Sequence, residues 1–363
     1  MSQLGLGMAP DDAPPGARPP RREHSGAWAV LVAVAALLVV GLAVVLGLRS
    51  LAGSSNDFQG QGDGSVTVVV APGDSLRQIG RTLADAGVVS DAGAFVDAAS
   101  SDPRAQSIEP GTYTLRSHMS AAAAVALMLD PSSRQVRKLV IPEGWRQDKI
   151  IDAAAKATGL STDQIKASLS RAATLGLPTY AAGSTEGFLF PATYDFQPGV
   201  TSDQVVTAML KRFNQSAMQL DLEASAKATG RTPLEIVTVA SILEIEAGPD
   251  DYDKVARVIY NRLAAGMPLQ LDSTVNYALG VSSLKLTADQ LKTDSPYNTY
   301  LNKGLPPGPI DAPGDAALQA ALNPATGSWL YFVTTDPKTK KTEFATSYAD
   351  FLALKKQFQS NAG

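Results

Sequence analysis

The chain has 363 residues and a mass of 37.9 kDa, with 31 lysines and arginines, 35 aspartates and glutamates, and a formal net charge of −4 at pH 7. This length accommodates about two ordinary domains, and the slightly acidic balance gives no electrostatic basis for binding nucleic acid. The absence of cysteine excludes disulfides, thiolate nucleophiles and cysteine metal sites. Because histidine occurs only at His24 and His118, we expect no Ser-His-Asp centre, no metal site and no cofactor. Any catalysis then depends on carboxyl groups.

The N-terminal residues predict a tail, a membrane anchor and a linker. Residues 1–26 are rich in proline and glycine and are expected to be disordered. Residues 27–48 contain no charge and would be about 33 Å long as a helix, which predicts a single transmembrane helix; a cleaved signal peptide is the alternative. Three arginines precede this run and Arg49 alone closely follows it, so we expect a cytoplasmic N-terminus and an extracytoplasmic remainder at the cell membrane. Residues 49–64 are expected to be a flexible linker.

Residues 65–133 are expected to form a small module. Residues 66–71 are strand-like and lead through a Pro-Gly turn into a helix capped by Asp74 or Ser75. A second short helix and a strand at residues 111–115 complete a β-α-α-β order. With its Pro-Gly-Asp-Ser-Leu segment, this order resembles a LysM module, a fold that binds glycans containing N-acetylglucosamine. A purely structural α+β module is the alternative.

Residues 134–363 are expected to form a larger α+β domain. It opens with a strand from Lys138, a turn and an amphipathic helix. Glu143 and Glu186 each precede a glycine, so each backbone either approaches a ligand or simply turns. A turn or capping role is favoured for Glu143, whereas the two roles are equally supported for Glu186.

One helix in this domain is well delimited. Thr232 is a good N-cap, Glu235 completes a capping box and Gly248 supplies a stop. Between these ends almost every residue is apolar or small, so the helix is expected to be buried on most sides. At 100° per residue, Glu244 falls on the same stripe as Leu243 and other apolar side chains.

Glu244 is therefore the unusual acid of the chain. Burial among apolar side chains disfavours a charged carboxylate, raises its pKa and lets it hold the proton that a general acid needs. The alternative is a buried structural salt bridge with Arg257 or Arg262. Helical periodicity alone leaves both alternatives open.

Several motifs follow one another in a fixed order. They are Ile-Pro-Glu-Gly-Trp at 141–145, Glu-Gly-Phe-Leu-Phe-Pro-Ala-Thr-Tyr at 186–194, Ala-Ser-Ile-Leu-Glu at 240–244, Tyr-Asn-Arg-Leu at 260–263, Gln-Leu-Asp-Ser-Thr at 270–274, Ser-Pro-Tyr-Asn-Thr-Tyr at 295–300 and Gly-Leu-Pro-Pro-Gly-Pro-Ile at 304–310. Together they closely resemble the endolytic murein transglycosylase family, also called YceG-like, over roughly residues 65–355. The resemblance implies a YceG-like catalytic domain in the larger α+β part.

The resemblance also implies an activity. Members of this family are membrane-anchored lytic transglycosylases that cut nascent peptidoglycan strands at the β-1,4 bond between N-acetylmuramic acid and N-acetylglucosamine. They leave 1,6-anhydro ends and so terminate glycan elongation, a role that implies peptidoglycan synthases as partners. The family's catalytic acid falls on Glu244, which would protonate the glycosidic oxygen and then deprotonate the muramic C6 hydroxyl. Asp272 is the candidate second carboxylate, and as a nucleophile it would make the reaction a hydrolysis.

Polar and aromatic side chains of these motifs suit a glycan cleft, because amides and hydroxyls bond sugar groups and tyrosine rings cover apolar sugar faces. Each could instead be a turn or core residue. The alternative for the whole chain is a non-catalytic peptidoglycan-binding scaffold of the wall-synthesis machinery, which has no need of Glu244. The expected substrate-binding residues are Glu186, Gln270, Asp272, Thr274, Tyr297, Asn298 and Tyr300.

Overall fold

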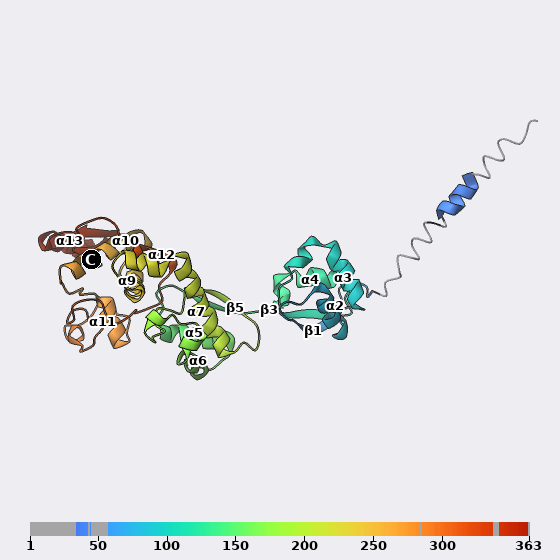
Figure 1. The fold of residues 1–363 in the computed structure, drawn as a ribbon, viewed down its shortest axis with the longest axis horizontal. Helices are drawn as coiled ribbons and strands as arrows, with labels where there is room; N and C mark the ends of the chain where they lie inside the picture. Colours follow the sequence, from blue (N-terminus) through green and yellow to red (C-terminus); the bar gives the residue numbers. More distant parts are fainter. Residues whose placement is uncertain (1–33, 43, 45–56, 284, 337–340, 362–363) are drawn as a thin grey trace, which may run out of the picture.

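The chain forms two folded units with separate hydrophobic cores, and the architecture is mixed α+β, as the sequence predicts (Figure 1). The core of the first unit is built from side chains within residues 66–129. The core of the second is built from side chains within residues 139–344. The computed structural model describes residues 34–42, 44, 57–283, 285–336 and 341–361.

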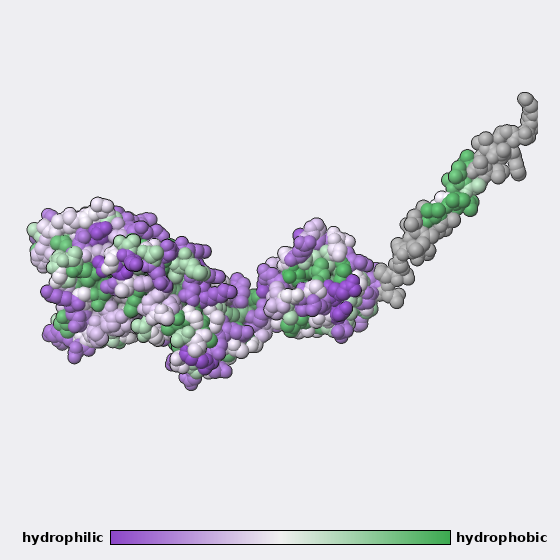
Figure 2. Space-filling view, in the orientation of Figure 1, coloured by the Kyte–Doolittle hydropathy of each residue, from purple (hydrophilic) through white to green (hydrophobic). Residues whose placement is uncertain are grey.

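The start of the described chain is helical and apolar. Residues 34–42 and 44 are helical, and large side chains among them, such as Leu37 and Leu38, are mostly exposed (Figure 2, green). None of the described helices combines the length and the apolar character that crossing a membrane requires. The predicted tail and most of the predicted membrane span lie outside the described residues.

The first unit has the expected order of two strands around two helices, followed by a third helix. Strand β1 pairs with β2 in antiparallel fashion, with Val68 opposite Tyr113. Of the two predicted caps of α2, Ser75 is the right one, because its side chain and that of Gln78 form a capping box. The elements are β1 (Asp63–Val70), α2 (Leu76–Asp85), α3 (Ala92–Ser101), β2 (Gly111–Ser117) and α4 (Ala121–Met128).

The prediction of a flexible linker over residues 49–64 is wrong for its last part. The Asp57 carboxylate accepts the backbone N–H of Ala121 at 2.9 Å, at the start of α4. The ring of Phe58 packs edge-on against His118, with ring centroids 4.9 Å apart. Glycine-rich composition indicated flexibility, but these side chains attach residues 57–64 to the first unit.

Strands β3 (Arg134–Gln135) and β4 (Arg137–Ile141) carry the chain into the second unit (Figure 1). Strand β4 pairs in antiparallel fashion with β5 (Ala192–Phe196), and α5 (Gln147–Thr158) packs on β4. The remaining elements are α6 (Thr162–Leu169), α7 (Ser202–Gln219), α8 (Leu222–Ala228), α9 (Pro233–Glu246), α10 (Tyr252–Ala264), α11 (Asp272–Leu279), α12 (Asp315–Leu322), the antiparallel pair β6 (Tyr331–Asp336) and β7 (Lys341–Ala345), and α13 (Tyr348–Asn361).

Helix α9 is the centre of the second unit. Its residues from Ile236 to Leu243 are all buried, and α8, α10, α11 and α12 pack around it. The predicted capping box of Thr232 and Glu235 is present. The helix ends at Glu246, and Gly248 has φ −88°, so it is not the left-handed stop that the sequence suggested.

Candidate active site

Glu244 lies where α9 leaves the core. Leu243 before it is fully buried, Ile245 after it is 52% exposed, and Glu244 itself is half-buried. Its carboxyl group accepts two hydrogen bonds, from the Tyr252 hydroxyl to Oε2 at 2.6 Å and from the Gly314 backbone N–H to Oε1 at 2.8 Å. These contacts fix the orientation of the carboxyl group at the end of the helix.

The alternative prediction for Glu244, a buried salt bridge, is wrong. Arg257 donates instead to the backbone oxygen of Ala325. Arg262 donates to the backbone oxygen of Leu330 at 2.6 Å. In the described part of the chain Glu244 has no cationic partner.

The surroundings of Glu244 favour its neutral form. Burial raises the pKa of Glu244 above its ordinary value, the hydrogen bonds from Tyr252 and Gly314 act in the opposite direction, and the nearby Glu143 carboxyl raises it further. Because burial has the largest effect, the neutral form of Glu244 is favoured relative to that of an exposed glutamate. The two donors are nevertheless in place to stabilise the carboxylate once that proton leaves. The group is therefore suited to giving up a proton and taking one back.

A short main-chain pairing brings the segments of the site together. The Gly144 N–H donates to the Ala312 oxygen at 3.0 Å, and the Ala312 N–H donates to the Trp145 oxygen at 2.9 Å. The Ile310 N–H donates to Ser241 Oγ on α9 at 3.0 Å. The loop before α12 is thus held against both the entry to α5 and the central helix.

Glu143 belongs to this assembly, although the sequence favoured a simple turn. Its side chain is exposed and lies against Gly314, where an added Cβ atom would overlap the Glu143 carboxyl group. Gly314 has an ordinary extended backbone with φ −87° and ψ 178°. A larger residue at position 314 would have to displace the flexible Glu143 side chain, but it would meet no backbone strain.

Glu186, the first residue of the motif at 186–194, is buried. Its carboxyl group accepts the Gln147 N–H at 3.0 Å and the Tyr277 hydroxyl at 3.3 Å. Burial raises the pKa of Glu186 to about 7. Gly187, with φ +86°, packs so closely on Pro309 that a Cβ atom would overlap the proline ring. The Glu186 turn therefore contacts the same loop that holds Gly314.

Asp311 is a site residue that the sequence analysis missed. It is 1% exposed, and neither carboxyl oxygen has a hydrogen-bond partner among the described residues. Burial raises the pKa of Asp311 well above its ordinary value, and Glu244 and Glu186 raise it further, against the effect of Arg146. The sequence signal that could have identified it is its place directly after Ile310, the apolar last residue of the 304–310 motif.

Two of the predicted substrate contacts are buried in this structure. Thr274 is fully buried, and its hydroxyl donates to the Leu271 oxygen at 2.7 Å. Asn298 is fully buried too, and its amide donates to the Thr293 oxygen at 2.8 Å. Both side chains hold loops together and offer no free group to a sugar.

Asp272 is not placed to assist Glu244 as a second carboxylate. It is exposed and accepts the Tyr300 hydroxyl at 2.6 Å. Its charge acts on the pKa of Glu246, whereas Glu143 is the carboxyl group that raises the pKa of Glu244. Asp272 and Tyr300 form a separate polar pair at the start of α11.

The remaining predicted contacts keep accessible surface. Gln270 is exposed and has φ +51°, an unusual value for a side chain with a Cβ atom. The Tyr297 ring lies 4.7 Å from the Tyr277 ring, centroid to centroid. Their role in binding stays a prediction.

Within the described residues no group of three histidine, aspartate or glutamate side chains is arranged to hold a metal ion.

Comparison with known proteins places the chain in a family. The model of the YceG-like family matches residues 68–357, and the chain belongs to that family. Two curated relatives are each named endolytic murein transglycosylase. The Streptococcus pneumoniae protein (serotype 2, strain D39) is 31% identical over 319 residues, covering 78% of this chain and 57% of that protein. The Bacillus subtilis protein (strain 168) is 33% identical over 245 residues, covering 63% of this chain and 68% of that protein.

A solved structure agrees with this placement. The crystal structure of a YceG-like protein from Listeria monocytogenes is 32% identical, with a TM-score of 0.55, and the match covers 80% of this chain and 98% of that one. The chain spans a little over half the length of the pneumococcal relative. These matches establish the family and the fold of the region that the chain shares with its relatives.

We predict that Glu143→Gln lowers the pKa of Glu244. The Glu143 carboxyl group is a nearby negative charge that raises the pKa of Glu244, and a glutamine of similar shape removes that charge. Carboxyl-carbon NMR of glutamate-labelled protein, with Glu244 assigned by Glu244→Gln, measures the change. Glu223→Gln is the matched control, because Glu223 is exposed and is not among the groups that act on the pKa of Glu244. An unchanged Glu244 titration in Glu143→Gln would contradict the assigned effect of Glu143.

We predict that Glu186 makes the protein less stable as pH rises. Its folded pKa of about 7 exceeds the ordinary 4.5, so the folded state binds more protons between these values and the free energy of unfolding falls across that window. The loss is on the order of 3 kcal/mol. Glu186→Gln removes it, so chemical denaturation at about pH 5 and about pH 8 should differ less than in the wild type. An equal pH dependence in Glu186→Gln and in the exposed control Glu223→Gln would refute this.

Proposed function

We propose that this chain is an endolytic lytic transglycosylase that cuts peptidoglycan strands between N-acetylmuramic acid and N-acetylglucosamine. The observation that carries the proposal is a half-buried Glu244 whose pKa is raised by burial and whose carboxyl group accepts two hydrogen bonds. The names of the pneumococcal and Bacillus relatives support the substrate. Cutting inside a strand and leaving 1,6-anhydro ends would terminate its elongation beside a peptidoglycan synthase.

The first step uses Glu244 as an acid. Its proton passes to the glycosidic oxygen, the bond from that oxygen to C1 of the muramic residue breaks, and an oxocarbenium-like centre develops at C1. The carboxylate left behind is stabilised by the Tyr252 hydroxyl and the Gly314 N–H. The acetamido group of the substrate itself can stabilise C1.

The second step uses Glu244 as a base. Its carboxylate takes the proton of the C6 hydroxyl of the muramic residue while the C6 oxygen bonds to C1. The product is a 1,6-anhydro ring and a protonated Glu244, ready for another cycle. No water is consumed, so one carboxyl group is sufficient for both proton transfers.

The states of the neighbouring acids favour this reaction over hydrolysis. A hydrolase needs a second carboxylate in ionised form, as nucleophile or as base for water. Glu186 and Asp311 are buried and their pKa values are raised, which disfavours ionisation. Asp272 is bonded to Tyr300 away from Glu244. The exposed Glu143 is the remaining neighbour that could act in a hydrolysis.

We predict that Glu244→Gln abolishes cleavage, because an amide can neither donate the required proton nor accept one from C6. The expected fall in kcat is about 10²- to 10⁴-fold. The full chain in detergent is incubated with purified glycan strands, and mass spectrometry identifies the new ends. Internal fragments ending in a 1,6-anhydro ring are expected from the wild type.

Glu246→Gln is the matched control, two residues further along α9, where a glutamine oxygen can still accept the Ser273 N–H. It should retain cleavage. Reducing ends in place of anhydro ends would make the enzyme a hydrolase and direct attention to Glu143. Intact strands after incubation with folded wild type would reject an enzyme and favour the peptidoglycan-binding scaffold.

We also propose that residues 27–48 anchor the chain in the cell membrane, with residues 1–26 in the cytoplasm and the folded units outside. The support is the uncharged sequence and the exposed apolar side chains of residues 34–42. A LysM-like first unit would then hold glycan near the membrane. Its β-α-α-β order and capped α2 support that resemblance.

The absence of cysteine gives a direct test of this topology. A cysteine introduced by Lys303→Cys, at an exposed site of the second unit, should react with a membrane-impermeant maleimide in intact cells. A cysteine introduced by Ser25→Cys should react only after the cells are permeabilised. Labelling of Ser25→Cys but not Lys303→Cys in intact cells would reverse the proposed orientation, and release of the protein by alkaline washing would reject the anchor.

A further inference from the structure

A pocket of about 210 Å³ opens beside Glu244. Ile245, the next residue along α9, forms part of its wall, together with Arg146 and Lys149 at the start of α5. Ser273 of α11 and Asp311 of the loop before α12 line it as well. The volume suits one substituent of a larger ligand better than a whole drug-sized molecule.

The two basic side chains of this pocket form no ion pair among the described residues. Arg146 uses one N–H of Nη2 to reach the Val281 oxygen at 2.7 Å, and its guanidinium lies 5.4 Å from the centroid of the Tyr277 ring. These contacts hold the side chain in place and leave its other N–H groups available. Lys149 is exposed, in the first turn of α5, where the positive end of the helix dipole adds to its charge.

The acids that face Arg146 do not neutralise it. Asp311 is 1% exposed, and its carboxyl oxygens have no hydrogen-bond partner in the described chain. Burial raises the pKa of Asp311 well above its ordinary value, which favours the neutral form of this acid. The Glu186 carboxyl group accepts the Gln147 N–H and the Tyr277 hydroxyl and does not line the pocket. The Asp148 carboxylate accepts the backbone N–H of Lys149 and is not part of the pocket wall. The pocket therefore keeps a surplus of positive charge.

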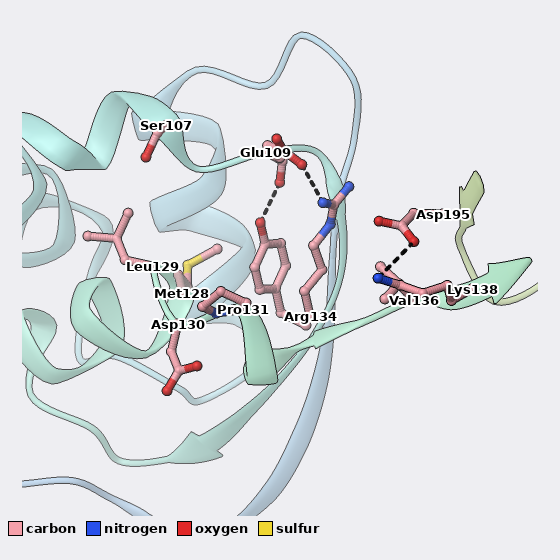
Figure 3. A pocket seen from close by; sticks show the side chains of 11 residues that line it. Ser107, Glu109, Met128, Leu129, Asp130, Pro131, Arg134, Val136, Lys138 and Asp195 are labelled. Atoms are coloured by element: carbon pink, nitrogen blue, oxygen red, sulfur yellow. Dashed lines mark hydrogen bonds and ion pairs between the residues drawn. The ribbon is translucent and has the colours of Figure 1, made fainter. Parts of the chain in front are cut away.

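The larger pocket between the two units shows the opposite arrangement. It has a volume of about 420 Å³, and Figure 3 shows each of its two basic side chains turned toward an acid. Arg134 is paired with Glu109, and Lys138 lies 3.9 Å from Asp195 (Figure 3). Because these cations already have acid partners, that pocket lacks the unpaired charge found beside Glu244.

We propose that the pocket beside Glu244 binds a carboxylate of the substrate, with Arg146 and Lys149 as its cationic ligands. This inference rests on the proposed function, because it names the part of the glycan that the site recognises. A muramic residue differs from a glucosamine residue by its lactyl ether, which ends in a carboxylate or continues into a stem peptide that carries carboxylates. Binding that substituent beside Glu244 would place the muramic residue, and not its neighbour, at the acid.

Binding of defined tetrasaccharides to the full chain tests the inference. The protein carries Glu244→Gln so that no ligand is consumed, and calorimetry at low salt gives each Kd. The ligands are a muramic-glucosamine tetrasaccharide with free lactyl carboxylates, the same tetrasaccharide with stem peptides, and a tetrasaccharide of N-acetylglucosamine alone. We expect at least one carboxylate ligand to bind more tightly than the neutral one.

Lys149→Gln should reduce this preference about three- to tenfold, the usual effect of one partly exposed charge-assisted contact. Lys149→Arg should restore it, because the charge returns. Lys156→Gln is the matched control, another exposed lysine of α5 outside the pocket, and it should leave the preference unchanged. Equal Kd values for all three ligands, or an unchanged preference in Lys149→Gln, would overturn the inference.

The ligands also separate the two sources of carboxylate. Preference for the free lactyl ligand assigns the pocket to the lactyl group, and preference for the peptide-bearing ligand alone assigns it to the stem. The binding assay requires no cleavage, so its result is independent of the proposed function. A Lys149-dependent preference without anhydro products would retain this inference and reject the transglycosylase. Cleavage to anhydro products without the preference would retain the transglycosylase and reject this inference.

Discussion

The site depends on the pairing of two loops by main-chain hydrogen bonds. Gly144 and Trp145 pair with Ala312, and the loop that carries Ala312 is fastened to α9 by the bond from Ile310 to Ser241. Without this arrangement neither Gly314 nor the cations at the start of α5 would have a fixed relation to Glu244. Backbone bonds depend little on side-chain identity, so the frame can stay constant while the residues it presents vary.

Burial of α9 determines the chemistry that this frame can support. Other helices surround α9, so Glu244 at its end is partly removed from water, and this desolvation raises its pKa. The hydrogen bonds from Tyr252 and Gly314 stabilise the carboxylate, so desolvation does not prevent Glu244 from ionising. The balance between these opposing effects allows one group to act as acid and as base.

Local sequence predicted the elements well and the contacts less well. The capping box of Thr232, the cap at Ser75 and the buried character of α9 follow from short-range rules, and all three are present. Thr274 and Asn298 show the limit, because a hydroxyl or an amide in a motif looks the same whether it bonds a ligand or a backbone oxygen a few residues away. The full burial of both side chains comes from the packing of the whole unit, and no local pattern encodes it.

Asp311 shows that a local pattern can also fail to reveal a residue that belongs to the site. A carboxyl group after an apolar motif looks like an ordinary loop acid until the fold buries it between Glu244 and Glu186. Three carboxyl groups in one small region cannot all ionise at modest cost, so the most buried of them, Asp311, is the one whose ionisation is most disfavoured. Glu186 and Glu244 each accept two hydrogen bonds, and Glu244 is the less buried of the two. The lower burial of Glu244 makes it the accessible acid of the three, and the disfavoured ionisation of Asp311 leaves Arg146 without an acid partner among the described residues. Because burial disfavours the ionised form of Asp311, this acid does not cancel the positive charge of Arg146.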